Sequence, residues 1–542
     1  MILKKPYAFI IKHFRIIHLL LIIPMLYLIT KTKGIVTFFS DYIANGYMLS
    51  SDYVLSNLAS NYINIWMYLS VIFILVVTIF LSIVLQKKDK PTKYYNSCII
   101  YYIGMLLIIT ACFSFFQMIE TDTLDDVVAR IIRDLSYIIH YSEYFFLIFT
   151  FVRGIGFNIK KFNFKNDLTD LEISNEDSEE FEFLVGTDPY KAKRTIRRFF
   201  RELRYYYLEN KFIFSVIGIV LAIVIGTLIY MNREVYMREY NEQDTISFGY
   251  LTFNIKDSFI TTLTYNGDVL NKDKAYLVMR VELNNRYRED KGFSYSDLQL
   301  VVNKEYITPN ISLGNYFKDF GNPYNGSNIK GNTSNTYLLV YEIDKYLVNS
   351  KFYISAYSGF DASPGGIGVI SKKIHISPSI QKDNVIKNTV GLGTNMSFKN
   401  TNVGNSLANI SGYEITNRFT YITKYCYTKD NCYDLSKIIT YDEDNKPLVI
   451  SRKTLLILDF DLILDDSSRY MSTPKSYQTF FEDYLMITYT VNGKTIQTKA
   501  KVINPNNYND KLIIPISKDI EYAGSIVVTL TVRNISYTIN LK

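Results

Sequence analysis

The sequence is poor in the residues and motifs that most often carry out chemistry. Its 542 residues include only four cysteines, four histidines and one tryptophan. It contains no Gly-x4-Gly-Lys-Ser/Thr phosphate loop, no Gly-x-Ser-x-Gly nucleophile turn and no His-Glu-x-x-His zinc motif. The cysteines and histidines also lack the spacing of a zinc site. We therefore expect no catalytic residues, no cofactor and no bound metal, and we expect that the protein is not an enzyme.

Long apolar segments are absent from residues 232–542 and are concentrated before that point. A helix needs about 20 apolar residues to cross the hydrocarbon core of a bilayer. Five segments meet or approach this length: Ile16–Thr30, Ile65–Leu85, Cys98–Met118, Leu135–Val152 and Phe212–Met231. The first is not a signal peptide, because Lys31 and Lys33 follow it instead of a small-x-small cleavage site. The sequence therefore predicts a polytopic α-helical membrane domain with five spans.

Lysine and arginine are unevenly distributed around these segments. With the N-terminus inside, the inner pieces carry the following bases: Lys4, Lys5, Lys12, Arg15, Lys87, Lys88, Lys90 and Lys93, and those of 153–211. The outer loops hold only Lys31, Lys33, Arg130 and Arg133. The positive-inside rule then puts the N-terminus in the cytoplasm and residues 232–542 outside the cell. Because Ile, Asn, Lys and Tyr are abundant, as in low-GC bacteria, we expect a multi-pass protein of a bacterial cell membrane.

His140 and Glu143 are ionisable residues inside the fourth apolar segment, on one face of the expected helix. Burying such groups in lipid is costly, so they are candidates for a proton or cation relay. The alternative is a hydrogen bond that packs one helix against another. The pattern favours this alternative, since no second segment offers a clear acidic or basic partner.

The predicted cytoplasmic loop, residues 153–211, has two blocks of opposite charge. Asp167–Glu182 contains eight acids and no base, which predicts a mobile, solvated segment. Lys191–Lys211 contains eight bases, two acids and an apolar stripe at helical spacing. We expect an amphipathic helix on the anionic lipids of the inner leaflet, or alternatively a docking helix for a cytoplasmic partner. Its surface residues are Arg194, Arg197, Arg198, Phe199, Phe200, Arg201 and Arg204.

The net charge of +7 is thus concentrated on one side of the expected membrane. This distribution argues for the lipid bilayer as a partner and against nucleic acid. Together with the apolar segments it divides the N-terminal part into a four-span domain (1–152), a cytoplasmic loop (153–211) and a fifth span (212–231).

From Asp244 onward, apolar and polar side chains alternate between Asn, Asp, Gly and Ser clusters, which predicts short strands of β-sandwiches. A polar stretch before Asn384 predicts a boundary between two extracytoplasmic all-β domains, 232–380 and 381–542. Asn492-Gly493 between two strand-like runs predicts a tight type I′ hairpin. Gly314–Asn335 is expected to be a loop. The paired carboxylates Asp459 and Asp461 could bind calcium, but a solvated strand face gives the same pattern.

Cys426 and Cys432 enclose a turn-forming pentapeptide between two strand-like runs. Outside the membrane a disulfide across this hairpin is expected. Free thiols remain the alternative if the organism makes few disulfides.

One region resembles a known family. YLVMRVELNN (Tyr276–Asn285), SYSDLQLVVNKEYITP and GNTSNTYLLVYEID are similar in pattern to the telokin-like immunoglobulin-type domain of bacterial surface proteins. The resemblance covers residues from about 244 to 377. It implies an immunoglobulin-like sandwich that acts as a binding or spacer module, and it implies no catalytic residues.

These features lead to a functional expectation. We expect a non-enzymatic membrane protein that displays two β-sandwich domains on the outer face for binding or assembly, with envelope proteins as partners. The alternative is an accessory or sensor subunit of a transporter that couples the outer domains to a cytoplasmic partner. An enzyme acting on envelope lipids or glycans has the least support.

Overall fold

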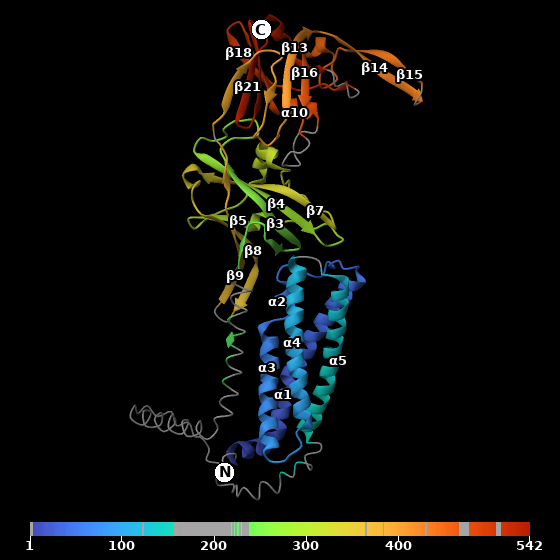
Figure 1. Ribbon diagram of the computed structural model, residues 1–542, viewed down its shortest axis with the longest axis vertical. Helices are drawn as coiled ribbons and strands as arrows, with labels where there is room; N and C mark the ends of the chain where they lie inside the picture. The colour runs from blue at the N-terminus through green and yellow to red at the C-terminus, as the bar shows by residue number, and fades with distance from the viewer. Residues whose placement is uncertain are drawn as a thin grey trace, which may run out of the picture.

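The computed structural model describes most of the chain outside the segment between residues 156 and 238. The described residues are 4–121, 124–156, 238–363, 366–382, 384–428, 431–465, 476–505 and 511–542, with 162, 164, 218, 222, 225, 226 and 229. The molecule is elongated, with a helix bundle at one end and β-sheets stacked beyond it toward the C-terminus (Figure 1).

Four long helices and one short helix form the bundle. They are α1 (Lys4–Ala44), α2 (Leu58–Tyr62), α3 (Ile65–Gln86), α4 (Lys93–Thr121) and α5 (Asp126–Ile155). Ile10–Ala44, Ile65–Gln86, Lys93–Thr121 and Asp126–Ile155 are long and apolar enough to cross a membrane. The predicted apolar helices are therefore confirmed for the first four segments. The fifth, Phe212–Met231, lies almost entirely outside the described residues and stays a prediction.

The helices extend beyond the third and fourth apolar segments, because α4 continues to Thr121 and α5 begins at Asp126. The charged residues there hid the helix from a hydropathy argument. Asp125 explains the early start, because its side chain accepts hydrogen bonds from the amides of Val127 and Val128 at the helix N-terminus.

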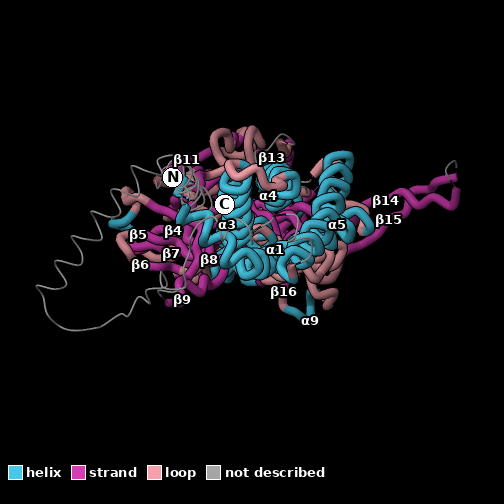
Figure 2. The backbone as a smooth tube through the Cα atoms, turned by 90° about the horizontal axis from the view of Figure 1, so that it is seen from below, coloured by secondary structure: helices cyan, strands magenta, loops and turns pink. Residues whose placement is uncertain are grey.

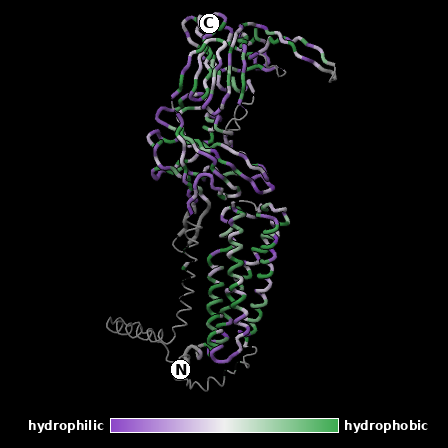
Figure 3. The backbone as a smooth tube through the Cα atoms, in the orientation of Figure 1, coloured by the Kyte–Doolittle hydropathy of each residue, from purple (hydrophilic) through white to green (hydrophobic). Residues whose placement is uncertain are grey.

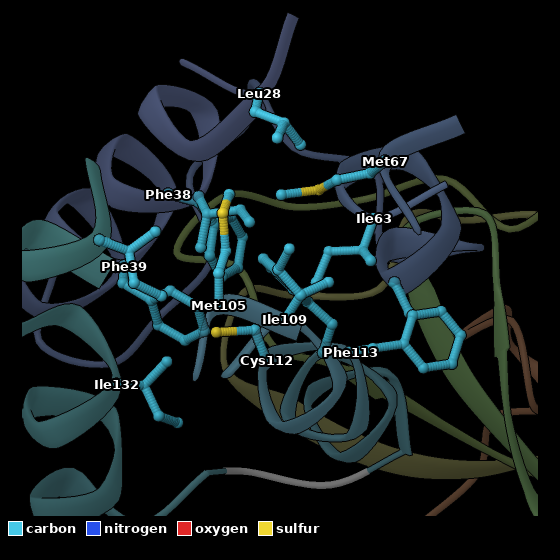
Figure 4. Close-up of a cluster of buried hydrophobic side chains, with 14 of the residues drawn as sticks. Leu28, Phe38, Phe39, Ile63, Met67, Met105, Ile109, Cys112, Phe113 and Ile132 are labelled. Atoms are coloured by element: carbon cyan, nitrogen blue, oxygen red, sulfur yellow. The ribbon is translucent and has the colours of Figure 1, made fainter. Parts of the chain in front are cut away.

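Aromatic and aliphatic side chains fill the space between the helices (Figure 4). Phe38 and Phe39 of α1 contact Phe116 of α4, and all three are fully buried. The outward faces remain apolar, with Ile100 74% and Leu107 68% exposed. An apolar exterior around a packed apolar core is what a helix bundle in lipid requires.

The first sheet pair follows the bundle. Its strands are β1 (Glu239–Asn241), β2 (Thr245–Phe248), β3 (Leu251–Thr261), β4 (Lys274–Asn285), β5 (Leu298–Val302), β6 (Glu305–Ile307), β7 (Thr333–Asp344), β8 (Phe352–Ser363), β9 (Gly366–Ile376) and β10 (Ser379–Ile380). They form one sheet in the order β1-β9-β8-β5-β6 and another in the order β10-β3-β4-β7, with β2 paired to β3. One hydrophobic core lies between the two sheets.

The second sheet pair contains β11 (Ile386–Val390), β12 (Met396–Ser397), β13 (Leu407–Thr416), β16 (Lys453–Ile463), β17 (Leu485–Val491), β18 (Lys494–Lys499), β19 (Lys511–Ser517), β20 (Ser525–Val532) and β21 (Ile535–Asn540). The sheet orders are β11-β21-β20-β17-β18 and β12-β13-β16-β19. Two short helices, α9 (Leu448–Ser451) and α10 (Tyr477–Tyr484), lie between strands. A separate hydrophobic core fills this pair.

A two-stranded hairpin arm, β14 (Phe419–Thr428) and β15 (Asn431–Ile439), extends away from the second sheet pair (Figures 1 and 2). The C-terminal part of the chain is thus an all-β sandwich region, as predicted. The tight hairpin is confirmed, because Val491 pairs with Lys494 and both Asn492 and Gly493 have positive φ. The expected loop Gly314–Asn335 was wrong in part, because Ile311–Phe320 is a 3-10 helical segment. Phe317 and Phe320 pack there under β4 and β7, which explains the local order.

Candidate functional site

The first candidate site is the junction between the helix bundle and the first sheet pair, which polar side chains connect directly. After β4, the Arg286 guanidinium donates to the carbonyl of Ile119 in the last turn of α4. Arg288 Nη2 lies 2.7 Å from the carbonyl oxygen of Asn45, the residue after α1 ends. Tyr287 lies between the two arginines, and its hydroxyl donates to the Tyr53 carbonyl at 2.8 Å.

The two arginines therefore meet the C-terminal ends of the two helices that end at the junction. The last carbonyls of a helix have no partner within the helix, and the helix dipole gives that end a partial negative charge. A guanidinium supplies both the missing donors and the opposite charge. Arg286 and Arg288 thus attach the first sheet pair to α4 and α1 through hydrogen bonds from their guanidinium groups to helix-end carbonyls.

A polar cavity of about 210 Å³ lies beside these contacts. Its wall carries two bases, Arg238 and Lys372, and two acids, Glu120 and Asp244. Lys372 Nζ donates to the carbonyl and to the hydroxyl of Ser247, both at 2.9 Å. Burial lowers the pKa of Lys372, and the nearby Glu120 carboxylate acts in the opposite direction. The cavity at the junction is therefore lined by side chains of both charges.

The second candidate site is a row of polar side chains on the buried face of α5 (Figure 3 shows the hydropathy of the bundle). Each has a partner on a neighbouring helix, and the pairs are Ser136 Oγ with Cys112 Sγ at 3.9 Å, His140 Nδ1 with Thr32 Oγ1 at 3.0 Å, Glu143 Oε1 with Tyr102 at 2.7 Å, and Thr150 Oγ1 with Tyr94 at 2.5 Å. These pairs tie α5 to α1 and α4.

The predicted pair His140 and Glu143 belongs to this row, but the two side chains have different partners. His140 is 7% exposed and meets α1, whereas Glu143 is fully buried and meets α4. Each residue therefore takes part in a contact between helices, and the role of the pair stays a prediction. Glu143 Oε2 has no hydrogen-bond partner among the described residues.

A buried ion pair connects the first sheet pair to the second. Arg533, in the turn after β20, donates from Nε and Nη2 to the two carboxylate oxygens of Asp319, each at 2.6 Å. Its third nitrogen, Nη1, donates to Thr261 Oγ1 and to the Leu263 carbonyl. The side chains of Arg533 and Asp319 are only 4% and 1% exposed. Asn402 Nδ2 adds a further bond to Asp319 at 2.6 Å.

The hairpin arm carries the predicted cysteine pair. The strand register sets Cys426 opposite Cys432, and Cys432 is disulfide-bonded. Both observations fit the predicted bond, although the Cys426 side chain lies outside the described residues. Apolar side chains are exposed along the arm, including Ile422 at 66% and Ile438 at 59%.

Other predicted positions give no site in the described residues. The surface helix of Arg194, Arg197, Arg198, Phe199, Phe200, Arg201 and Arg204 lies outside them. Asp459 pairs with Lys511 at 2.9 Å on the strand surface, as a solvated face would. The described residues contain no group of three His, Cys, Asp or Glu side chains placed to hold a metal.

The sequence argument missed Arg286, Arg288, Arg533 and Asp319. Two of them had a usable signal, because the segment Arg286-Tyr287-Arg288 directly follows a predicted strand that ends in Asn. Arginines beside an aromatic residue at a strand end are frequent contact residues. Arg533 and Asp319 had no such signal, since each looks like an ordinary loop charge.

Comparisons with known proteins assign no family. No protein-family profile matches the chain, and no curated protein matches it. Among solved structures, the Bacillus subtilis protein ycdA, described as a candidate lipoprotein, aligns over 25% of this chain and 38% of its own length, with 16% identity and a TM-score of 0.17. A β-sandwich protein from Clostridium difficile 630 aligns over 30% of this chain and 99% of its own, with 14% identity and a TM-score of 0.18.

The I-band fragment of titin aligns over 54% of this chain and 96% of its own, with 7% identity and a TM-score of 0.10. This chain spans little more than a third of the length of ycdA, and all three TM-scores are far below 0.5. No property of these proteins is carried over. The resemblance of residues 244–377 to the telokin-like family therefore stays a prediction, and the observed strands support the β-sandwich alone.

Proposed function

We propose that the protein is a non-enzymatic, multi-pass anchor that holds two β-sandwich domains, 232–380 and 381–542, on the outer face of a bacterial cell membrane for assembly with envelope proteins. The observation that carries this proposal is the capping of α4 and α1 by Arg286 and Arg288. An anchor must transmit the position of its membrane part to the part it displays. Direct bonds between helix ends and a sheet do this, and a flexible linker does not.

The buried pair of Arg533 and Asp319 supports the same proposal, because it fixes the second sheet pair to the first. The hairpin arm then projects from the part of the molecule farthest from the bundle (Figure 1). The five-span topology, with the N-terminus in the cytoplasm, rests on the distribution of Lys and Arg.

Cysteine accessibility tests the topology. A cysteine at Ser327 should react with a membrane-impermeant thiol reagent in intact cells, whereas one at Ser174 should react only after the cells are opened. The native Cys98 and Cys112 are buried and should stay silent. Labelling at Ser174 in intact cells would contradict the five-span topology.

Cross-linking tests the assembly function. The full-length protein is cross-linked in intact cells, purified in mild detergent and analysed for linked peptides. We expect links from residues 381–542 to envelope proteins. Links confined to cytoplasmic proteins would contradict the display function.

The second candidate function is a sensor or transporter accessory subunit, and the charged cavity at the junction favours it. A ligand bound between Lys372 of β9 and Glu120 of α4 would contact a sheet and a helix at once. Its binding could therefore change the orientation of the sheet relative to the helix. Under this function, a ligand should change the distance between spin labels placed on opposite sides of the junction. A pure anchor should show no such change.

A further inference from the structure

The surroundings of Glu143 favour one protonation state of its side chain over the other. Within α5 it lies about 26 Å along the helix from Asp126 and about 18 Å from Ile155, so it is far from both ends. Its side chain is fully buried. Two side chains of α4, Tyr102 and Tyr101, lie within hydrogen-bonding reach of the carboxyl, and neither carries a positive charge.

The hydrogen-bond inventory decides between the two forms. A carboxylate only accepts hydrogen bonds, whereas a carboxylic acid accepts at one oxygen and donates from the other. Tyr102 donates to Oε1 at 2.7 Å, which satisfies one acceptor in either form. Tyr101 donates its hydroxyl hydrogen to the carbonyl of Ile139 at 2.7 Å, so it has none left for Glu143. Its oxygen, however, is free to accept a hydrogen.

A carboxylate at this position would leave Oε2 buried without a donor, which matches the unpartnered atom in the structure. An uncompensated buried charge of this kind is strongly destabilising. A proton on Oε2 removes the charge and supplies a donor toward the Tyr101 oxygen. We propose that Glu143 is a proton-binding site inside the bundle, with Tyr102 as donor to one oxygen and Tyr101 as acceptor from the other.

The other titratable groups around this site are accounted for. Cys98 of α4 lies near Tyr102 and the Glu143 carboxyl. His140, three residues before Glu143 on α5, is bonded to Thr32 of α1. His18 of α1 is bonded to Tyr95. Among the described residues no positively charged side chain interacts with Glu143, so a bound proton is what would remove the charge of the carboxylate.

At position 143 a glutamic acid can release a proton, which a glutamine cannot do. Glutamine would also accept from Tyr102 and donate to Tyr101, so helix packing alone does not require a carboxyl group. The acid can release its proton. The site therefore gives the bundle a chemical property that an inert anchor would lack, and it stands independently of the proposed function.

Infrared difference spectroscopy tests the inference on the full-length protein in lipid bilayers at neutral pH. Subtracting the spectrum of Glu143→Gln from that of the unsubstituted protein should isolate the carbonyl stretch of one protonated carboxylic acid. Glu282→Gln is the matched control, because Glu282 pairs with Lys256 at 2.6 Å and should instead show loss of carboxylate bands. Tyr101→Phe removes the acceptor and should shift the acid band to higher frequency.

A second measurement needs no variant and so does not depend on a variant folding. The apolar reagent dicyclohexylcarbodiimide reacts with protonated carboxyls in apolar surroundings, and peptide mass mapping should find its adduct on Glu143. A water-soluble carbodiimide should leave Glu143 unmodified. Loss of carboxylate bands in the Glu143→Gln difference, or absence of the adduct from Glu143, would overturn the inference.

Discussion

Two contacts connect the parts of the molecule by different means. The joint, made by Arg533 and Asp319, connects the two sheet pairs, and the junction, made by Arg286 and Arg288, connects the first sheet pair to the helix bundle. At the joint, the bidentate pair of Arg533 and Asp319 is buried and has additional donors and acceptors around it. At the junction, arginines bond to helix-end carbonyls, Arg288 is exposed, and polar cavities of about 210 and 370 Å³ lie alongside. The joint thus holds a buried pair of opposite charges, whereas the junction combines the buried Arg286 and the exposed Arg288 with polar cavities.

This difference indicates where motion is easiest. Moving the joint would separate two desolvated charges, which is costly. Moving the junction would separate arginines from neutral carbonyl oxygens and not from an opposite charge, so we expect it to cost less. We therefore expect the two sheet pairs to move as one body relative to the bundle. The following changes would break or sharpen this comparison.

The largest effect is expected from breaking the joint. Arg533→Ala leaves the Asp319 carboxylate buried and unpaired, and should lower the free energy of unfolding by about 3–5 kcal/mol. Chemical denaturation of the full-length protein in detergent, followed by tyrosine fluorescence, measures the change. Lys318→Ala removes the half-exposed ion pair with Asp483 at the same joint and is the matched control, with about 0–1 kcal/mol expected. Equal effects of the two substitutions would refute the role of burial.

Breaking the main junction contact should have a smaller effect. Arg286→Ala leaves the Ile119 carbonyl without its charged donor and should cost about 2 kcal/mol. The exposed Arg288 provides the control, since Arg288→Ala should cost less than about 1 kcal/mol. Thermal unfolding of both variants in detergent gives the comparison. If Arg288→Ala proves the more damaging, helix-end capping at α4 does not hold the junction.

Hydropathy predicted the helices because lipid demands continuous apolar segments, whatever contacts form later. Local turn chemistry likewise predicted the hairpin at Asn492-Gly493. The strand β19 was not among the segments predicted as strands, and it carries Pro515 within Lys511–Ser517. The proline is tolerated because β19 is the last strand in its sheet order, where one face of the backbone needs no ladder partner.

The side-chain contacts at the joint and at the junction could not be predicted either, because their residues are far apart in the sequence. Arg533 and Asp319 are 214 residues apart, and Arg286 and Ile119 are 167 apart. No local pattern in the sequence links such pairs, because only the packed sheets bring them together. Glu143 was found from the sequence since an acid in an apolar segment is conspicuous. Its partners Tyr101 and Tyr102 were not, because tyrosine is ordinary in this chain.

The hairpin arm should respond to reduction without affecting either connection. A disulfide between Cys426 and Cys432 closes a short loop and should stabilise the arm by about 2 kcal/mol. We expect reduction to speed proteolysis within 419–439 while the unfolding midpoint of the rest is unchanged. The Cys432→Ser variant should behave as reduced protein under oxidising conditions. If reduction also lowered the unfolding midpoint of the two sheet pairs, the arm would not be a separate unit.

The smallest effect is expected at the rim of the larger junction cavity, where Glu282 pairs with Lys256. The hydrogen bond from Lys256 is the main cause that lowers the pKa of Glu282 from its ordinary value of 4.5. The unfolded chain therefore binds more protons than the folded chain in this range, so the stabilisation is present above pH 4.5 and is lost as the pH falls through the folded value. Because both side chains are about one-third exposed or more, solvent screens the pair and its contribution should stay below about 1 kcal/mol. Thermal midpoints of Glu282→Gln and the unsubstituted protein should differ slightly at neutral pH and converge in acid. A difference as large as that of Arg533→Ala would mean that an ion pair at the junction contributes as much as the buried pair at the joint, and the contrast between them would fail.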